Sequence, residues 1–388
     1  MASAPRPTTA ELLARLVAFD TTSRNPNLPL IESVGAYLAA LGVPYRLSRD
    51  GTGSKANLHA IVGPQAPGGV AFSGHVDTVP VDGQAWTGDP FALRRRDGRL
   101  VGRGTADMKG FVAAMLAAVP DLLAANLARP VHLFLSYDEE VSCDGARRLV
   151  DDLGESGLLP ALCIVGEPTG MQPVLAHKGR LAAEALVRGK AWHSSETDRG
   201  ANAVQAAAEA VAWIAAEARR RERDGPFKPG FDPPCTTWHV GTFEGGTILN
   251  IVPERARFVF EIRNLPGEDS RADLARFEAH VRAEIEPRLR AVDPACGFEV
   301  RVLNVLPSFS LDPAHALADA VRQVTGANAT GKVSYGTEAG IYQEAGLATI
   351  VCGPGHIAQA HTADEWIAED QLAQCDLFLR RIAARLAA

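Results

Sequence analysis

Five residues of types that bind divalent cations are spread along the chain, most of them directly after short apolar segments. They are two histidines and three acidic residues: His75, Asp107, Glu140, Glu167 and His361. Imidazole nitrogens and carboxylate oxygens are good zinc ligands, and three carboxylates plus one hydroxide would balance the charge of two Zn²⁺ ions. The set therefore predicts a pair of zinc ions that share one carboxylate.

Two further acidic residues have spacings that suit supporting roles. Asp77 lies two residues after His75 and could accept the second N–H of that imidazole. Glu139 precedes Glu140, and because neighbours on an extended or turning backbone point in different directions, Glu139 could take a proton from the attacking water as a general base. In isolation these residues would also fit a structural polar pair and an exposed acidic turn. The other candidate ligands favour the metal site.

The apolar segments have the length and composition of buried strands of an α/β fold. We expect strands over residues 57–62, 70–73, 131–136, 161–165 and 348–352. Polar residues follow the last four of them, and open α/β sheets place their sites outside the carboxyl ends of strands. The polar ends are therefore predicted to meet in space.

Helices are predicted between these strands. Thr8 and Glu11 form a capping box for a helix near residues 8–19, and a second helix is expected at roughly 29–41. The alanine-rich segment 111–118 predicts a buried helix that Pro120 should bend or end.

A different order of elements is predicted between residues 179 and 304. The pattern there is strand, helix, two strands, helix and strand, which is the ferredoxin-like α+β unit. Because this unit is complete in itself, we predict two domains: a discontinuous one formed by residues 1–178 and 305–388, and an inserted one formed by 179–304.

The composition is that of an ordinary soluble globular protein. The 388 residues are 46% hydrophobic and 22% charged, and the net charge of −7 argues against a nucleic-acid partner. The sequence has neither a long apolar window nor a signal-peptide pattern, so we expect no membrane partner and a cytoplasmic location. Six scattered cysteines indicate reduced thiols rather than a thiolate zinc site.

Five ordered blocks carry a family resemblance over nearly the whole chain. They are SGHVDTVP, GRGTADMKG, YDEEVS, GEPT and QAHTADEW. They resemble the M20 family of di-zinc amidohydrolases, and most closely the acetylornithine deacetylases. The resemblance implies a zinc-peptidase-like catalytic domain with a mixed central sheet flanked by helices, and a cis peptide after Asp107. Cobalt would be able to substitute for zinc.

The resemblance also assigns the ligands to individual metal ions. His75 and Glu167 would bind one zinc ion. Glu140 and His361 would bind the other, and Asp107 would bridge the two. In the same family pattern, Glu139 would be the base and Asp77 the residue that orients the imidazole.

In the inserted domain the resemblance singles out three residues. His193, in a G-x-x-x-H-S block, matches a histidine that crosses a dimer interface to stabilise the oxyanion, which implies an isologous homodimer through this domain. Asn250 and Arg263 match positions that contact substrate, and Arg263 would offer a bidentate partner for a carboxylate. Without the resemblance, His193 would be an ordinary surface or core histidine and Arg263 a solvated arginine.

Glycines and histidines near the last predicted strand leave alternatives open. Gly353 and Gly355 could let backbone N–H groups approach a substrate carboxylate, although a plain strand-to-loop turn explains them nearly as well. His177 and His356 are predicted to be structural or near the substrate, because five ligands already suffice.

The segment 336–340 bears on the substrate, a small N-acyl amino acid. It carries Glu338 where succinyl-diaminopimelate desuccinylases have an Asp-Gly-Arg block, which favours a substrate with a cationic far end. The sequence departs from the acetylornithine deacetylase pattern at Gly336 and Gly340, which replace Cys and Pro. We expect Glu338 near the ornithine amine or supporting the pocket beside it.

The resemblance implies deacetylation of N2-acetyl-L-ornithine to ornithine and acetate, a step of arginine biosynthesis. Acetylcitrulline deacetylase, succinyl-diaminopimelate desuccinylase and M20 dipeptidase are the alternatives among enzymes. A non-catalytic binder of N-acyl amino acids is a further alternative, but a binder has no use for a base such as Glu139.

Overall fold

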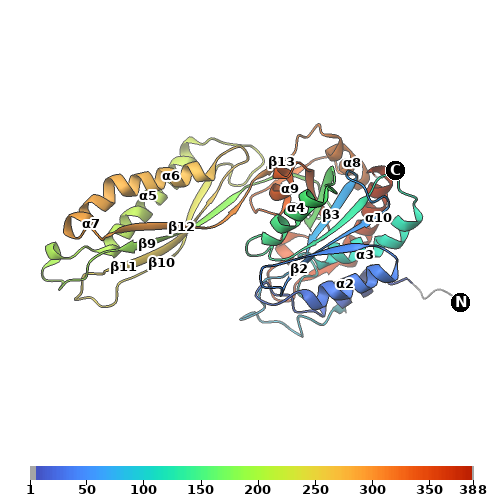
Figure 1. Ribbon diagram of the computed structural model, residues 1–388, viewed down its shortest axis with the longest axis horizontal. Helices are drawn as coiled ribbons and strands as arrows, with labels where there is room; N and C mark the ends of the chain where they lie inside the picture. The colour runs from blue at the N-terminus through green and yellow to red at the C-terminus, as the bar shows by residue number, and fades with distance from the viewer. Residues whose placement is uncertain (1–5, 387–388) are drawn as a thin grey trace. The chain divides into compact units, whose positions relative to one another are not determined.

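The chain forms two compact units in the computed structural model, which describes residues 6–386 (Figure 1). The first unit comprises residues up to 176, 310–331 and those from 337 on, and the second comprises 177–309 and 332–336. The insertion predicted at 179–304 falls inside the second unit. The short return of the chain at 332–336 had no signal in the sequence, because five residues between larger elements show no periodicity of their own.

The first unit and its boundary contain most of the regular elements. Its helices are α1 (Thr9–Val17), α2 (Leu28–Ala40), α3 (Lys109–Ala124), α4 (Asp144–Ser156), α8 (Ala316–Thr325), α9 (Ala339–Glu344), α10 (Glu369–Leu386) and the short η3 (Ile357–Gln359). Its strands are β1 (Tyr45–Arg49), β2 (Ala56–Val62), β3 (Val70–His75), β4 (Arg94–Arg96), β5 (Arg99–Val101), β6 (Val131–Ser136), β7 (Leu162–Pro168), β8 (Val174–His177), β13 (Phe309–Ser310), β14 (Gly331–Val333), β15 (Ala348–Gly353) and β16 (Trp366–Ala368).

The central sheet of this unit is mixed and flanked by helices, which confirms the predicted class (Figure 1). Its strands follow the order β1-β2-β6-β3-β7-β15-β8. Strands β6, β3, β7 and β15 pair in parallel, whereas β1–β2, β2–β6 and β15–β8 are antiparallel. Every residue of β3 and β6 is buried, which explains why both appear in the sequence as continuous apolar runs.

Helix α3 continues past Pro120, so of the two expected effects, bending or ending the helix, the second does not occur. A proline inside a helix cannot donate to the carbonyl four residues earlier, which here is Leu116. The hydroxyl of Tyr37 donates to that carbonyl oxygen at 3.2 Å. Tyr37, from α2, therefore supplies the donor that Pro120 lacks. The capping box of α1 is confirmed, with Thr8 and Glu11 each accepting from the other's backbone N–H.

Two buried histidines, His59 of β2 and His132 of β6, lie side by side in the sheet. The Nε2 of His132 donates to the carbonyl oxygen of Gly68 at 3.1 Å, so its Nδ1 accepts from His59 Nε2 at 3.0 Å. The rings stack with centroids 5.2 Å apart. Burial lowers the pKa of His59 to about 3 and that of His132 to about 4. Both imidazoles are therefore neutral in the folded chain at neutral pH.

This pair predicts a loss of stability in mild acid. Between pH 6.5 and about 4 the unfolded chain protonates both imidazoles while the folded chain does not, so stability falls as the pH falls through this window. Each imidazole that stays neutral costs about 1.4 kcal/mol per pH unit below 6.5, so we expect the pair to account for a loss of about 5 kcal/mol in the free energy of unfolding between pH 7 and about pH 4.5. Urea unfolding with EDTA present, at pH 7 and at about pH 4.5, measures this loss. The variant His59→Gln/His132→Gln should lose clearly less over the same interval, and an equal loss in both proteins would contradict the assignment.

The second unit has the predicted β-α-β-β-α-β order. Its elements are β9 (Arg180–Arg188), η1 (Thr197–Arg199), α5 (Ala203–Asp224), β10 (Thr237–Gly245), β11 (Arg255–Arg263), α6 (Ser270–His280), the π-helical turn η2 (Val281–Ile285), α7 (Glu286–Val292) and β12 (Gly297–Leu306). The strands form an antiparallel sheet in the order β10-β11-β9-β12. This is the strand order of the ferredoxin-like unit.

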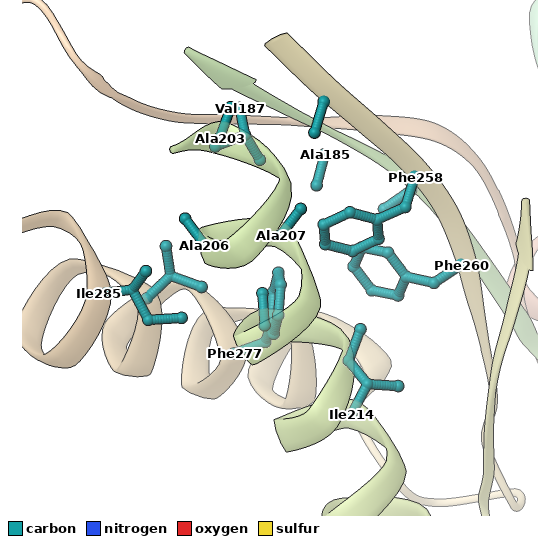
Figure 2. Close-up of a cluster of buried hydrophobic side chains, with 14 of the residues drawn as sticks. Ala185, Val187, Ala203, Ala206, Ala207, Ile214, Phe258, Phe260, Phe277 and Ile285 are labelled. Atoms are coloured by element: carbon teal, nitrogen blue, oxygen red, sulfur yellow. The ribbon is translucent and has the colours of Figure 1, made fainter. Parts of the chain in front are cut away.

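One hydrophobic core lies between this sheet and its helices (Figure 2). Small side chains of α5 line this core: Ala207 faces Phe258 of β11, and Ala203 lies beside Val187 of β9. Phe277 of α6 packs against Phe260 with ring centroids 5.1 Å apart. Because alanines leave room for the phenyl rings, the helix can lie close to the sheet.

Between residues 6 and 386, no helix combines the length and apolarity needed to span a bilayer.

Candidate di-metal site

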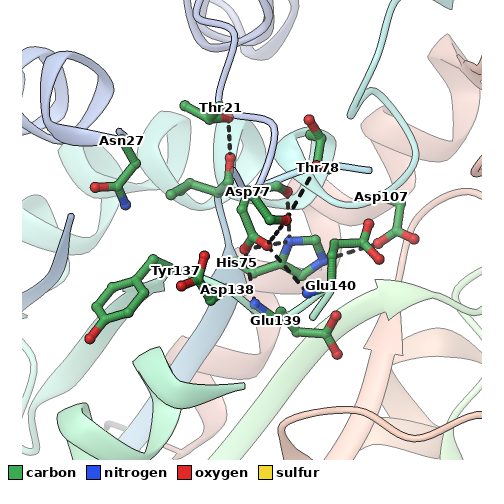
Figure 3. Close-up of polar contacts among 12 residues, drawn as sticks. Thr21, Asn27, His75, Asp77, Thr78, Asp107, Tyr137, Asp138, Glu139 and Glu140 are labelled. Atoms are coloured by element: carbon green, nitrogen blue, oxygen red, sulfur yellow. Dashed lines mark hydrogen bonds and ion pairs between the residues drawn. The ribbon is translucent and has the colours of Figure 1, made fainter. Parts of the chain in front are cut away.

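Three parallel strands bring most of the predicted ligands to one edge of the sheet. His75 is the last residue of β3 and pairs in register with Ser136, the last residue of β6. Glu139 and Glu140 follow β6 closely, and Glu167 lies near the end of β7, which also pairs with β3. Parallel neighbours end at the same edge, so these side chains meet there, as expected from the sequence. Figure 3 shows His75, Glu139 and Glu140 close together.

Asp107 reaches the same place from the loop before α3. Its Oδ1 lies 3.1 Å from Nε2 of His75, and its Oδ2 lies 3.2 Å from Nε2 of His361. The His361 Nε2 is also 3.1 Å from the Glu140 carboxylate. One carboxylate with an oxygen toward each of two imidazoles has the geometry that a bridging ligand needs. The peptide between Asp107 and Met108 is cis, which confirms the expectation from the family resemblance.

Ligand atoms gather in two overlapping groups, with the atoms of each group within 4.8 Å of one another. One group is His75, Glu139 and Glu167, and the other is His75, Asp107 and Glu140. Glu139, predicted as the base, therefore lies within reach of a cation held by His75 and Glu167. Its assignment as base rather than ligand stays a prediction.

Asp77 orients both His75 and the acidic pair. The Nδ1 of His75 lies 2.9 Å from the backbone oxygen of Asp77 and 3.5 Å from its carboxylate. An Nδ1–H that donates there leaves the lone pair of Nε2 directed at the cluster. The Asp77 carboxylate also accepts from the backbone N–H groups of Glu139 at 3.1 Å and Glu140 at 3.2 Å, and from the Ser23 hydroxyl at 2.7 Å (Figure 3).

The cluster holds more buried carboxylates than its own imidazoles can neutralise. Burial raises the pKa of Glu139 and of Glu167 well above the usual range, and neighbouring carboxylates raise both further. Hydrogen bonds with Asp107 and Glu140 raise the pKa of His361 to about 10. A surplus of buried negative charge can be neutralised by a pair of divalent cations. Imidazole and carboxylate ligands suit cations such as Zn²⁺ or Co²⁺.

Two predicted substrate residues of the first unit, Glu338 and Gly353, are buried. Glu338 is fully buried, and its Oε2 accepts from the hydroxyls of Tyr342 at 3.2 Å and Ser73 at 3.3 Å. The N–H of Gly353 donates to Thr169 Oγ1 at 3.2 Å. The Glu338 carboxylate and the Gly353 N–H thus have partners within the protein, and substrate contact by either stays a prediction.

Backbone geometry by itself explains both glycines of the last loop. A Cβ at position 353 would lie 2.0 Å from the carbonyl oxygen of Gly166, and Gly355 has φ of +81°. The N–H of Gly355 donates to Gln371 Oε1 at 3.3 Å. Nearby, His356 is exposed and caps η3, whereas His177 is buried with its Nδ1 2.9 Å from the Lys178 carbonyl oxygen. Neither histidine belongs to the two groups of ligand atoms.

In the second unit, His193 and Asn250 lie close together. The N–H of Ser194 donates to the carbonyl oxygen of Asn250 at 3.1 Å, and both His193 and Asn250 are exposed. Arg263 directs its guanidinium at Glu261, with Nε 2.7 Å and Nη2 3.3 Å from that carboxylate. A substrate carboxylate would therefore have to compete with Glu261 for Arg263.

Several residues that shape the cluster were missed by the sequence reasoning. Ser23 binds Asp77, and Lys55 forms an ion pair with Asp138 beside the acidic pair. Arg103 and Glu365 form a buried ion pair next to Asp107. Only the last two had a signal, because they lie inside the blocks GRGTADMKG and QAHTADEW; Ser23 and Lys55 are far away in the chain.

Known proteins resemble the chain at the levels of family, sequence and fold. Residues 71–385 match the model of peptidase family M20/M25/M40. The acetylornithine deacetylase of Myxococcus xanthus is 38% identical over 96% of both chains, and that of Photorhabdus laumondii subsp. laumondii is 33% identical over 90% of this chain and 88% of its own. The Bacillus subtilis protein YXEP, a dinuclear metal-binding peptidase of the M20 family, superposes with a TM-score of 0.67 at 16% identity and 98% coverage of both chains. With the M20 motifs gathered at one edge of the sheet and a family match over most of its length, the chain belongs to peptidase family M20/M25/M40.

Proposed function

We propose that the chain is a di-zinc amidohydrolase that cleaves N2-acetyl-L-ornithine into ornithine and acetate. The observation that carries the proposal is the position of Asp107 between two imidazoles, 3.1 Å and 3.2 Å away, with Glu139 in the same cluster. Two acetylornithine deacetylases among its relatives support the choice of substrate. His75, Glu167, Glu140 and His361 would hold two zinc ions with Asp107 shared, and Co²⁺ would be able to replace zinc.

The residues of this cluster suit metal-assisted amide hydrolysis. Two divalent cations bound here would polarise the amide carbonyl and lower the pKa of a water molecule. Glu139 would accept a proton from the attacking water and return it to the leaving amine.

His193 is proposed to stabilise the oxyanion from the second copy of an isologous homodimer. The backbone N–H of Ser195 donates to His193 Nδ1 at 3.2 Å, so the ring proton lies on Nε2. An exposed Nε2–H is a suitable donor to a developing negative charge. Sedimentation of the purified protein tests the dimer, and mixing inactive His193→Ala and Glu139→Ala chains tests the action across subunits, since only mixed dimers would regain activity.

Glu338 is proposed to favour a substrate with a cationic side chain. Because Glu338 is buried near Glu139, its charge would attract a cationic substrate side chain over a distance rather than by direct contact. We expect Glu338→Gln to lower the ratio of kcat/KM for acetylornithine to that for acetylmethionine several-fold. An unchanged ratio would show that Glu338 does not contribute to the preference for a cationic side chain.

A substrate panel tests the proposed function as a whole. Amine release by the zinc-loaded or cobalt-loaded protein is measured with acetylornithine, acetylcitrulline, acetylmethionine, succinyl-diaminopimelate and a dipeptide. We expect the highest kcat/KM with acetylornithine. A higher value with another amide would replace the proposed substrate, and binding without any hydrolysis would favour a non-catalytic binder.

A further inference from the structure

Glu365 is a buried carboxylate that holds the loop of Asp107 by its backbone. It is 1% exposed, and its Oε1 accepts from the N–H groups of Ala106 at 2.9 Å and Asp107 at 3.1 Å. Its Oε2 accepts from the N–H of Gly104 at 3.0 Å and from Arg103 Nη1 at 2.8 Å. Bonds of this kind are charge-assisted and stronger than those between neutral groups. Glu365 thus fixes the peptide that presents the shared carboxylate.

Arg103 and Gln84 extend this network to the loop of His361. The Arg103 side chain is 1% exposed, and its Nη2 donates to Gln84 Oε1 and, at 3.3 Å, to the Pro80 carbonyl oxygen. Gln84 Nε2 in turn donates to the backbone oxygen of His361 at 2.9 Å. An unbroken series of side-chain hydrogen bonds therefore joins the main chain at Asp107 to the main chain at His361.

The His361 loop has particular need of such an anchor. His361 has φ of +61°, a backbone conformation that costs free energy for a residue other than glycine. Its side chain is 49% exposed, so packing does little to hold the ring in place. The ring nevertheless has to keep its Nε2 beside Asp107 and Glu140, and metal–ligand distances tolerate only about 0.2 Å of error.

We infer that Glu365, Arg103 and Gln84 are positioning residues that set the spacing between Asp107 and His361 and thereby the affinity for the cations. This inference rests on the di-metal site of the proposed function. Gln84 bonds to the backbone oxygen of His361 and Glu365 to the backbone N–H of Asp107, so these residues act through the main chain of the ligands. Loss of Gln84 and loss of Glu365 should differ in their effect on the two cation affinities. Asp107, which Glu365 holds, would bind both cations, whereas His361, which Gln84 holds, would bind only one.

The decisive variant is Gln84→Leu, which removes the bonds to His361 and to Arg103 Nη2 and leaves Glu365 and Arg103 paired. Zinc is titrated into the metal-free protein against a chromophoric chelator, without substrate, to give two dissociation constants. We expect one constant to rise about 10- to 100-fold and the other to stay nearly unchanged. The d–d absorption of the cobalt-loaded variant should change for one of two ions.

A second variant tests the Asp107 side of the network. Glu365→Gln alone would leave the buried Arg103 without its counter-charge, so the double variant Glu365→Gln/Arg103→Met, which removes both charges, is compared as well. In this folded double variant we expect both constants to rise. Asp82→Asn is the matched control, because exposed Asp82 lies on the Gln84 loop and pairs only with Arg24 in the described part of the chain. It should leave both constants unchanged.

Three outcomes would overturn the inference: two unchanged constants in Gln84→Leu, an equal rise of both in that variant, or an equal effect of Asp82→Asn. Because zinc affinity is measured without substrate, the inference and the proposed function fail separately. A wild-type protein that binds two zinc ions but does not hydrolyse acetylornithine would end the proposed function alone. Fully active variants with wild-type constants would end the inference alone.

Discussion

Replacing Glu139 by alanine is expected to lower kcat by about 10²- to 10⁴-fold while the protein still binds two zinc ions. A general base contributes about this factor, and the other candidate ligands remain in place. Glu139 lies in the cluster with His75 and Glu167, and its backbone N–H is held by Asp77. The measurements are kcat with acetylornithine and metal content after gel filtration.

Metal content decides between the two roles that the geometry allows for Glu139. A base can be removed without loss of zinc, whereas removal of a ligand lowers the zinc content as well as kcat. Glu139→Gln is the matched variant, because an amide keeps the volume of the side chain but accepts no proton at neutral pH. Substantial turnover in either fully metallated variant would falsify the base assignment.

Replacing Glu167 by glutamine is expected to change stability in opposite directions with and without metal. Glu167 is 4% exposed and lies beside Asp107 and Glu139, so in the metal-free protein its charge is buried among like charges. The amide removes this repulsion, and we expect the metal-free variant to be as stable as the wild type or more stable by about 1–2 kcal/mol. Zinc should then stabilise the variant far less, because an amide oxygen is a poorer zinc ligand than a carboxylate.

Urea unfolding near pH 7, with EDTA or with excess zinc, measures both effects. At zinc concentrations 100 times Kd, the wild type should gain about 2.7 kcal/mol for each zinc ion that it binds. The pKa of Glu167 is raised in the folded metal-free chain, so its contribution to stability is largest below its unfolded pKa and is lost as the pH rises. The EDTA-treated wild type should therefore lose more stability between about pH 5 and pH 7 than Glu167→Gln does. A variant that is less stable than the wild type with EDTA would contradict this account.

Local sequence patterns predicted the elements whose residues are buried on both sides. Strands β3, β6, β7 and β15 were expected because their runs of apolar residues stop abruptly at polar ones. The ferredoxin-like order of the second unit was also expected, because apolar residues recur with a different period in strands and in helices. The sequence left open whether α3 bends or ends at Pro120, because the donor that permits its continuation comes from Tyr37 in another helix.

The candidate metal ligands and the strand ends at which they lie follow from residue type and chain order. Residue type and position after a buried strand are local properties, and parallel pairing then brings His75, Glu139, Glu140 and Glu167 to one edge. How Asp107 and His361 reach that edge depends on contacts between distant segments, since both lie on loops. Their positions depend on side chains such as Glu365 and Gln84, whose partners are remote in the chain. The tertiary structure also decided that Glu338 is buried, because burial depends on the packing of segments that no local pattern records.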